Sequence, residues 1–275
     1  MVSNLSFPEA LLQGFLSLGA SEPISLFILW LGSILKIDKT IYISLINGLF
    51  SSLIYLFFAR FDCRFFTPLL FFNFYFLVLI TSTERLKIAF VFLLISILTE
   101  RKRSILFYFL SIFNHLQLIL FLPTLVINNQ INSIKLFLTK FSIFKKDILR
   151  LLIIFIITIF VLALSYTSIA VKIGYLQEFE LKEFASNSII TFILLSGSRN
   201  KFNSFLLILP FILISPFIGA GRTIIMTFSL TTYILAREKR LLNPFYILIN
   251  LYLIIKFFIA VDSIVKYGDI FYLAN

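Results

Sequence analysis

The chain has 275 residues, of which 60% are hydrophobic, 17% aromatic and only 13% charged, and its mean hydropathy is +1.04. A soluble domain carries about 25% charged residues, so this composition excludes an ordinary soluble protein and indicates one embedded in a membrane. The net charge of +11 does not indicate a nucleic-acid partner, because the Lys and Arg residues stand at the ends of apolar runs, where the positive-inside rule explains them.

The apolar runs predict the fold class. The few Pro and Gly residues, 7 and 9, favour uninterrupted helices over a membrane β-barrel. We therefore predict an all-α fold, a polytopic membrane helix bundle of roughly 8–10 transmembrane or re-entrant helices. With no long linker and no internal repeat, residues 1–275 are expected to form a single integral membrane domain.

In the first half of the chain, residues 6–20 are moderately apolar and interrupted by glycines, so we expect them to be interfacial or partly inserted. A helix is expected to start at Pro23, directly after Glu22. Spans are predicted over residues 41–59 and 65–81, and two further apolar segments lie within 83–127, hinged at the basic residues 101–103. The basic residues flanking 41–59 on both sides suggest that one early helix is re-entrant, or that the positive-inside rule fails there.

In the second half, residues 131–144 fit either a short span or an amphipathic surface helix. Further apolar runs cover residues 148–171, 189–195, 205–218, 223–236 and 245–261, and the longest polar connection is 172–188. If the basic clusters at 101–103, 145–146 and 237–240 are cytoplasmic and 131–144 spans, then 83–85, 172–188 and 219–222 share the outer face.

Two arginines on that outer face are candidate anion-binding residues. Arg85 opens an apolar run, and Arg222 follows the helix break at Gly219-Ala220-Gly221. A guanidinium matches the geometry of a phosphate, and glycines allow a backbone to approach a ligand closely. The simpler alternative for both residues is a helix-end anchor at the membrane interface.

His115 is the single histidine of the chain and lies in an apolar segment, between Asn114 and Gln117. A polar group at membrane depth usually faces a bundle interior or a water-filled cavity, so His115 is a candidate general base or phosphate contact. The simpler alternative is a histidine whose hydrogen bonds are satisfied by a neighbouring helix. Glu22 is the other candidate base, and the alternative for it is a charge that favours the start of a helix. One histidine and one cysteine, Cys63, make a zinc site improbable, and we predict no metal and no cofactor.

These elements together resemble the EpsG-like and Wzy-type polysaccharide polymerases. The resemblance is carried by Glu22-Pro23, by Arg85 opening an apolar helix, by the basic connection at 100–103, by Asn114-His115 through Pro123, and by Gly221-Arg222. It covers roughly residues 20–250, and the extra N-terminal span and aspartate-containing loop usual in the family are not found here.

The resemblance implies a metal-independent, membrane-embedded glycosyltransferase, multi-pass in the bacterial inner membrane. It would polymerise oligosaccharide repeat units carried on undecaprenyl diphosphate at the outer face, for O-antigen, capsule or exopolysaccharide. Arg85 and Arg222 would bind the diphosphate, and His115 or Glu22 would act as the base. The implied partners are the lipid-linked oligosaccharide and membrane lipid, and a chain-length regulator protein is left open.

Two other functions use similar residues. A flippase or transporter for the same lipid-linked sugar would also place cations in a membrane cavity, although such proteins commonly contain repeats, which this sequence lacks. A membrane O-acyltransferase would need a histidine base near an acyl donor. The sequence leaves these alternatives open.

Overall fold

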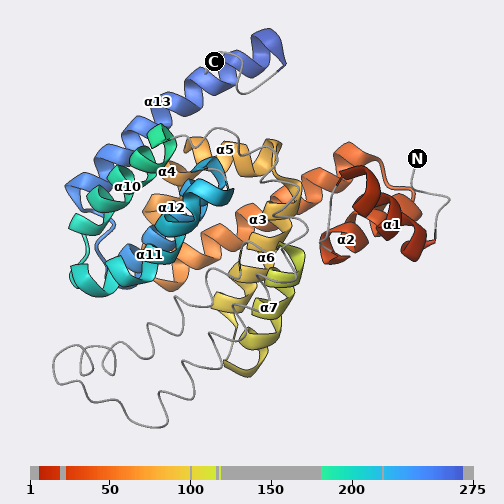
Figure 1. The fold of residues 1–275 in the computed structure, drawn as a ribbon, viewed down its shortest axis with the longest axis horizontal. Coiled ribbons are helices and arrows are strands. Elements are labelled where there is room, and N and C mark those ends of the chain that lie inside the picture. The colour runs from red at the N-terminus through yellow and green to blue at the C-terminus, as the bar shows by residue number, and fades with distance from the viewer. Residues whose placement is uncertain are drawn as a thin grey trace. The chain divides into compact units, whose positions relative to one another are not determined.

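The computed structural model describes residues 6–18, 23–99, 101–115, 118, 181–218 and 220–268, and every regular element in these ranges is helical (Figure 1). The all-α class is therefore confirmed for the described part of the chain. Two compact units are present, one formed by Met1–Leu116 with Ile247–Asn275 and the other by Gln117–Tyr246. The prediction that they belong to a single membrane domain stays a prediction.

The elements of the first unit are short helices and a few long ones. In chain order they are α1 (Phe7–Leu18), α2 (Pro23–Ile34), α3 (Lys39–Arg60), the 3-10 turn η1 (Arg64–Phe66), α4 (Thr67–Phe71), α5 (Phe74–Thr81), α6 (Glu84–Leu98), α7 (Arg101–Asn114) and most of α13 (Pro244–Tyr267). The second unit holds α10 (Leu181–Ser196), α11 (Lys201–Ile218) and α12 (Ala220–Arg237).

Among the described helices, α3 and α13 are long and apolar enough to cross a membrane. A third candidate is the bent pair formed by Arg64–Phe71 and α5, which is a broken span or a re-entrant loop. These two or three helices indicate membrane association. The larger number of spans predicted from the sequence stays a prediction.

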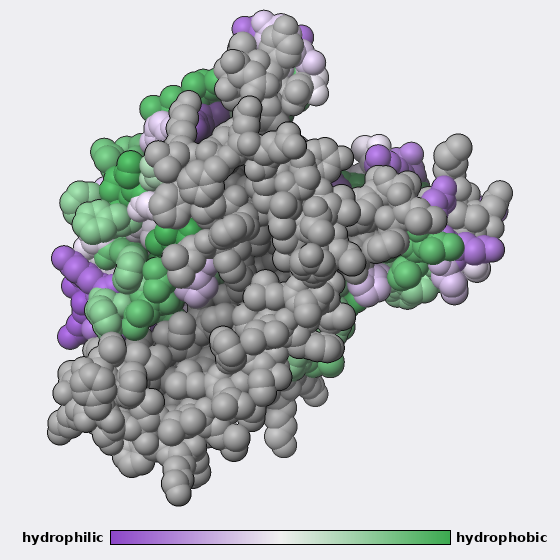
Figure 2. All heavy atoms as spheres, in the orientation of Figure 1, coloured by the Kyte–Doolittle hydropathy of each residue, from purple (hydrophilic) through white to green (hydrophobic). Residues whose placement is uncertain are grey.

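The surfaces of α3 and α13 are those of lipid-facing helices. Only 28% of the apolar window of each helix is buried within the protein. Leu45 on α3 is 62% exposed and Val265 on α13 is 79% exposed, and Figure 2 shows hydrophobic side chains covering much of the described surface. Soluble monomers rarely expose apolar patches of this extent, so lipid is the natural neighbour of these faces.

The most enclosed helix of the first unit is α6. It packs against α2, α3, α5 and α7, and nearly every residue from 86 to 94 is buried, with Ala89 completely inaccessible. A helix that is apolar on all sides is covered either by other protein elements or by lipid, and α6 is covered by protein. The start of α6 is therefore held at a defined place in the first unit.

Residues 65–81, which we predicted as one span, are broken at Phe72 and Asn73, where the two helices meet at 68°. Asn73 is fully buried, and its Oδ1 accepts a hydrogen bond from the Tyr75 N–H at 2.8 Å, which caps α5. Its Nδ2 donates to Oδ1 of Asn250 on α13 at 3.1 Å. The Asn73 amide thus stabilises the break in two ways, because it caps the start of α5 and hydrogen-bonds to α13.

In the second unit, the glutamate that follows α12 holds the turn between α10 and α11. Both carboxylate oxygens of Glu238 accept a hydrogen bond from Ser198 Oγ at 3.1 Å, and Oε2 accepts one from the Arg199 N–H at 2.7 Å. Gly197 lies in the same turn, where a Cβ atom would come within 2.8 Å of the Asn243 side chain. The C-terminal ends of α10 and α12 are thus adjacent, and a hydrogen bond joins Asn187 and Thr223 nearer their N-terminal ends. The two helices therefore pack in the same direction.

We predict that Asn73→Ala lowers the free energy of unfolding by about 2–4 kcal/mol. The substitution removes a helix cap, worth about 1 kcal/mol, and leaves the buried amide of Asn250 without this donor, which costs about 1–3 kcal/mol. Denaturation in mixed detergent micelles, followed by circular dichroism, measures the change.

The matched control is Asp38→Ala, because Asp38 caps α3 at an exposed position by accepting hydrogen bonds from Thr40 N and Ile41 N at 2.8 and 3.3 Å. It should cost about 1 kcal/mol, the value of a cap alone. Equal losses in the two variants would show that the Asn73–Asn250 contact adds nothing to stability.

Candidate functional site

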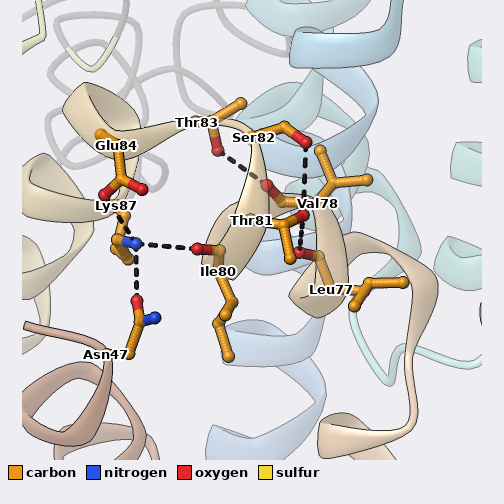
Figure 3. Close-up of polar contacts among 9 residues, drawn as sticks. All are labelled: Asn47, Leu77, Val78, Ile80, Thr81, Ser82, Thr83, Glu84 and Lys87. Atoms are coloured by element: carbon orange, nitrogen blue, oxygen red, sulfur yellow. Dashed lines mark hydrogen bonds and ion pairs between the residues drawn. The ribbon is translucent and has the colours of Figure 1, made fainter. Parts of the chain in front are cut away.

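The most unusual side chain of the first unit is that of Lys87, which is 0% exposed although it carries a charge (Figure 3). Its Nζ donates hydrogen bonds to Asn47 Oδ1 at 2.6 Å and to the Ile80 carbonyl at 2.9 Å, and it lies 2.7 Å from Glu84 Oε2. An ammonium has three N–H donors, and here three oxygens surround it. We call these four residues the Lys87 cluster.

The cluster forms because the chain reverses between α5 and α6. Lys87 and Glu84 stand three residues apart on one face of α6, Ile80 belongs to the last turn of α5, and Asn47 lies in the interior of α3. The carbonyls at the end of a helix have no partner within it and carry the negative end of the helix dipole, so they attract a cation. One ammonium thereby joins three helices.

The contact with Glu84 is an ion pair rather than a well-directed hydrogen bond, because Oε2 accepts no hydrogen bond of good geometry in the described part of the chain. The Glu84 side chain is 31% exposed, so its carboxylate lies at the edge of the packed interior while Lys87 lies inside. A buried charge is tolerated only when its partners are all in place. The cluster therefore fixes how α3, α5 and α6 meet.

Arg85 occupies the first turn of α6, between the two members of this ion pair, and is partly exposed. The amides of a first helical turn and a nearby guanidinium both favour an anion. The structure thus places the predicted phosphate-binding arginine at a helix start that the Lys87 cluster holds in position.

His115 lies directly after α7 and is buried, with 6% exposure. Its backbone N–H donates to the Ser111 carbonyl at 3.0 Å, and the Ser25 hydroxyl of α2 donates to the Asn114 carbonyl at 3.3 Å. Ser25, Ser111 and Asn114 are each 0% exposed. These four residues form a buried polar cluster where α2 meets the end of α7, which we call the His115 cluster.

The His115 cluster contains polar atoms without a partner. Within the described residues, neither Oδ1 nor Nδ2 of Asn114 makes a hydrogen bond, and the same is true of the hydroxyl of Tyr108, one and a half turns earlier in α7. Unpaired polar atoms in a protein interior are uncommon and costly. The amide beside His115 therefore has hydrogen-bonding capacity that the described residues do not use.

The structure does not describe the side chains of the other two predicted site residues, Glu22 and Arg222. Glu22 lies outside the described residues. Arg222 belongs to the first turn of α12 in the second unit, and its side chain also lies outside what the structure describes. That Arg85 and Arg222 bind one diphosphate, and that His115 or Glu22 acts as the base, therefore stay predictions.

Neither Lys87 nor Asn47 was singled out from the sequence. A signal was present: an asparagine within the predicted span 41–59 and a lysine one turn into an apolar helix both needed a partner at membrane depth. Nothing in the sequence indicated that the two residues contact each other, since they are separated by 40 positions.

In the second unit, a line of buried polar side chains lies between α10 and α12. Asn187 Nδ2 donates to Thr223 Oγ1 at 3.4 Å, and both residues are 0% exposed. One turn further along each helix are Thr191 and Thr227, each 1% exposed, whose hydroxyls have no hydrogen-bond partner among the described residues. Polar side chains of this kind hydrogen-bond between helices in membranes.

No group of three or more His, Cys, Asp or Glu side chains that could hold a metal ion occurs in the described ranges. Comparison of the chain with protein-family models, with curated proteins and with solved structures finds no match. The interpretation of the site therefore depends on its own chemistry and on the resemblance in the sequence.

We predict that Lys87→Met lowers the free energy of unfolding by about 3 kcal/mol, the lower end for breaking a buried ion pair because Glu84 is 31% exposed. The variant leaves the Glu84 carboxylate without its counter-charge, and the Asn47 amide and the Ile80 carbonyl without this donor. Adding Glu84→Gln should recover most of the loss, because the double variant buries no unpaired charge.

The control is Asp262→Asn, which removes the ion pair between Asp262 and Lys266 on α13. That pair has a similar separation, 2.8 Å, but its side chains are 50% and 58% exposed, so the expected change is below about 0.5 kcal/mol. A Lys87→Met variant as stable as this control would show that the buried pair does not hold the helices together.

A second prediction compares two buried threonines of α12. Thr227→Val should leave stability unchanged or raise it by about 1 kcal/mol, because the lost hydroxyl has no partner among the described residues. Thr232→Val should lower stability by about 1 kcal/mol, because this hydroxyl donates to the Phe228 carbonyl at 2.8 Å and contacts the Tyr246 hydroxyl at 3.0 Å. Equal losses from the two variants would show that Thr227 also has a partner, such as an internal water.

Proposed function

We propose that this protein is a multi-pass membrane glycosyltransferase that polymerises oligosaccharide repeat units carried on undecaprenyl diphosphate, at the outer face of the bacterial inner membrane. The observation that carries the proposal is the position of Arg85 in the first turn of α6, at a helix start held by a fully buried lysine and its three partners. Rigid placement of a guanidinium is what recognition of a diphosphate requires.

In the proposed reaction, a sugar hydroxyl of the acceptor attacks the anomeric carbon of the growing chain. A new glycosidic C–O bond forms, the C–O bond to the lipid diphosphate breaks, and the hydroxyl proton passes to a base. Arg85 and Arg222 bind the diphosphate and stabilise the negative charge that builds on the leaving oxygen. No metal or cofactor takes part in this scheme.

His115 or Glu22 is the proposed base. Support for His115 comes from its cluster, because its imidazole is buried among polar groups, where it can act as a general base toward a substrate hydroxyl. The unpaired amide of Asn114 next to it suits a hydroxyl-bearing substrate, since an amide both donates and accepts. Lys87 acts as a positioning residue that keeps α6 and therefore Arg85 in place.

The proposal includes the larger helix bundle expected from the sequence, roughly 8–10 transmembrane or re-entrant helices. The described spans α3 and α13 and the bent pair before α6 are part of it. A chain-length regulator protein is a further proposed partner of such a polymerase.

We predict that Arg85→Ala abolishes polymer formation in a deletion strain complemented with the variant, because one of the two diphosphate contacts is lost. A polysaccharide gel should show the ladder replaced by a single-unit band, and Arg222→Ala should give the same result. Arg85→Lys should keep a weak ladder, since an ammonium retains the charge but loses the two-pronged geometry.

The control is Arg64→Ala, which removes an exposed arginine at the start of η1 and should leave the ladder unchanged at equal protein level. Full-length ladders from both Arg85→Ala and Arg222→Ala would refute the proposal. Repeat units held on the inner face would indicate a flippase instead, and a normal ladder lacking acyl groups an O-acyltransferase.

A further inference from the structure

Lys256 stands near the middle of α13, a helix that runs from Pro244 to Tyr267 and is one of the two candidate spans. At about 1.5 Å of rise per residue, each end of the helix is roughly 17 Å away. A lysine side chain is too short to bring its ammonium from this depth to the nearer water interface while keeping its head in solvent.

The ammonium of Lys256 is directed toward the N-terminal half of α13. Its Nζ lies 5.2 Å from the ring centroid of Tyr252, one turn earlier, and 5.8 Å from that of Phe74 at the start of α5. It therefore points away from the exposed charges of Asp262 and Lys266, which mark the other end of the helix. The two rings hold the charge at the level of the apolar part of the span.

Lys256 is exposed on the surface of the first unit, and no described carboxylate pairs with it. A charge at the centre of a bilayer costs several times what one exposed cation–π contact returns. The two aromatic rings reduce the free-energy cost of placing the Lys256 ammonium at this depth, but they do not remove it. An anionic group at the same depth would remove the remainder.

The side chains around Lys256 form a stripe of the kind that packs against another helix. Leu248, Tyr252, Ile255 and Ile259 recur at spacings of three and four residues, and they are 64%, 50%, 61% and 52% exposed. With Lys256 among them, they make one apolar face with a single positive charge. We call it the Lys256 face.

We propose that the Lys256 face docks a transmembrane helix of another protein, one that carries an Asp or Glu near the middle of the bilayer. A second copy of this chain does not fit, because a two-fold contact in the membrane would place Lys256 opposite Lys256 in a medium of low dielectric constant. A lipid phosphate does not fit either, because headgroups lie about 15 Å from the bilayer centre.

The test uses the purified full-length protein in liposomes at pH 7.5 and a Leu-rich transmembrane peptide with one central Asp. Energy transfer between a donor on the protein and an acceptor on the peptide reports their association. We expect the Asp peptide to bind at least tenfold more tightly than the same peptide with a central Leu. Lys256→Leu should abolish this difference, and Lys256→Arg should retain it.

The matched control is Lys266→Leu, which removes a lysine of the same helix that is already paired with Asp262 and should leave the difference intact. Circular dichroism and thermal unfolding of each variant confirm that it is folded. The readout is peptide binding, so the result is independent of whether the protein polymerises sugars.

Two results would overturn the proposal. Equal binding of the Asp and Leu peptides would show that the face is covered by another part of this chain or carries no available charge. Disulfide-linked dimers of Ile255→Cys in a Cys63→Ser background, formed in liposomes, would show that a second copy occupies the face instead.

Discussion

A charged group inside an apolar interior must have all of its partners in place, and Lys87 is where this constraint acts most strongly. Its ammonium is fully buried and is surrounded by oxygens from α3, α5 and α6. Apolar packing between membrane helices is weakly directional, whereas an ammonium with two hydrogen-bonded oxygens and one ion-paired carboxylate strongly restricts the arrangement. The start of α6, and with it Arg85, has its position because of this interaction.

Polar contacts between helices also occur elsewhere within each of the two units. Asn73 and Asn250 link the bent pair to α13, and Glu238 ties the turn between α10 and α11 to the end of α12. In each case a polar side chain serves a backbone group and a distant element at once. A small number of polar residues thus fixes the packing arrangement of many apolar helices. This matters in a membrane, because apolar contacts alone do not distinguish one helix arrangement from another.

Polar groups whose hydrogen bonds are satisfied within the chain stabilise its architecture, whereas polar groups without such partners are candidates for binding another molecule. The Lys87 cluster has its partners and explains architecture, so its part in the proposed reaction is to hold Arg85. Among the described residues, the amide of Asn114, beside His115, has no partner, and Lys256 lies over two aromatic rings without a carboxylate partner. In the two proposals, the Asn114 amide would contact a substrate and Lys256 would contact another helix.

The amino-acid sequence by itself determined that the protein is helical and belongs in a membrane, because apolar content and run length report directly on the surrounding medium. It also indicated that Arg85 and His115, as polar side chains beside or within apolar segments, require polar partners. It did not reveal the break at Asn73, because an asparagine in an apolar run signals a polar contact without naming the partner. The meeting of Asn47 with Lys87, and the direction of the Lys256 ammonium, were decided only by the tertiary structure. Such contacts join residues far apart in the chain, and their energy depends on distances that no local pattern of residues contains.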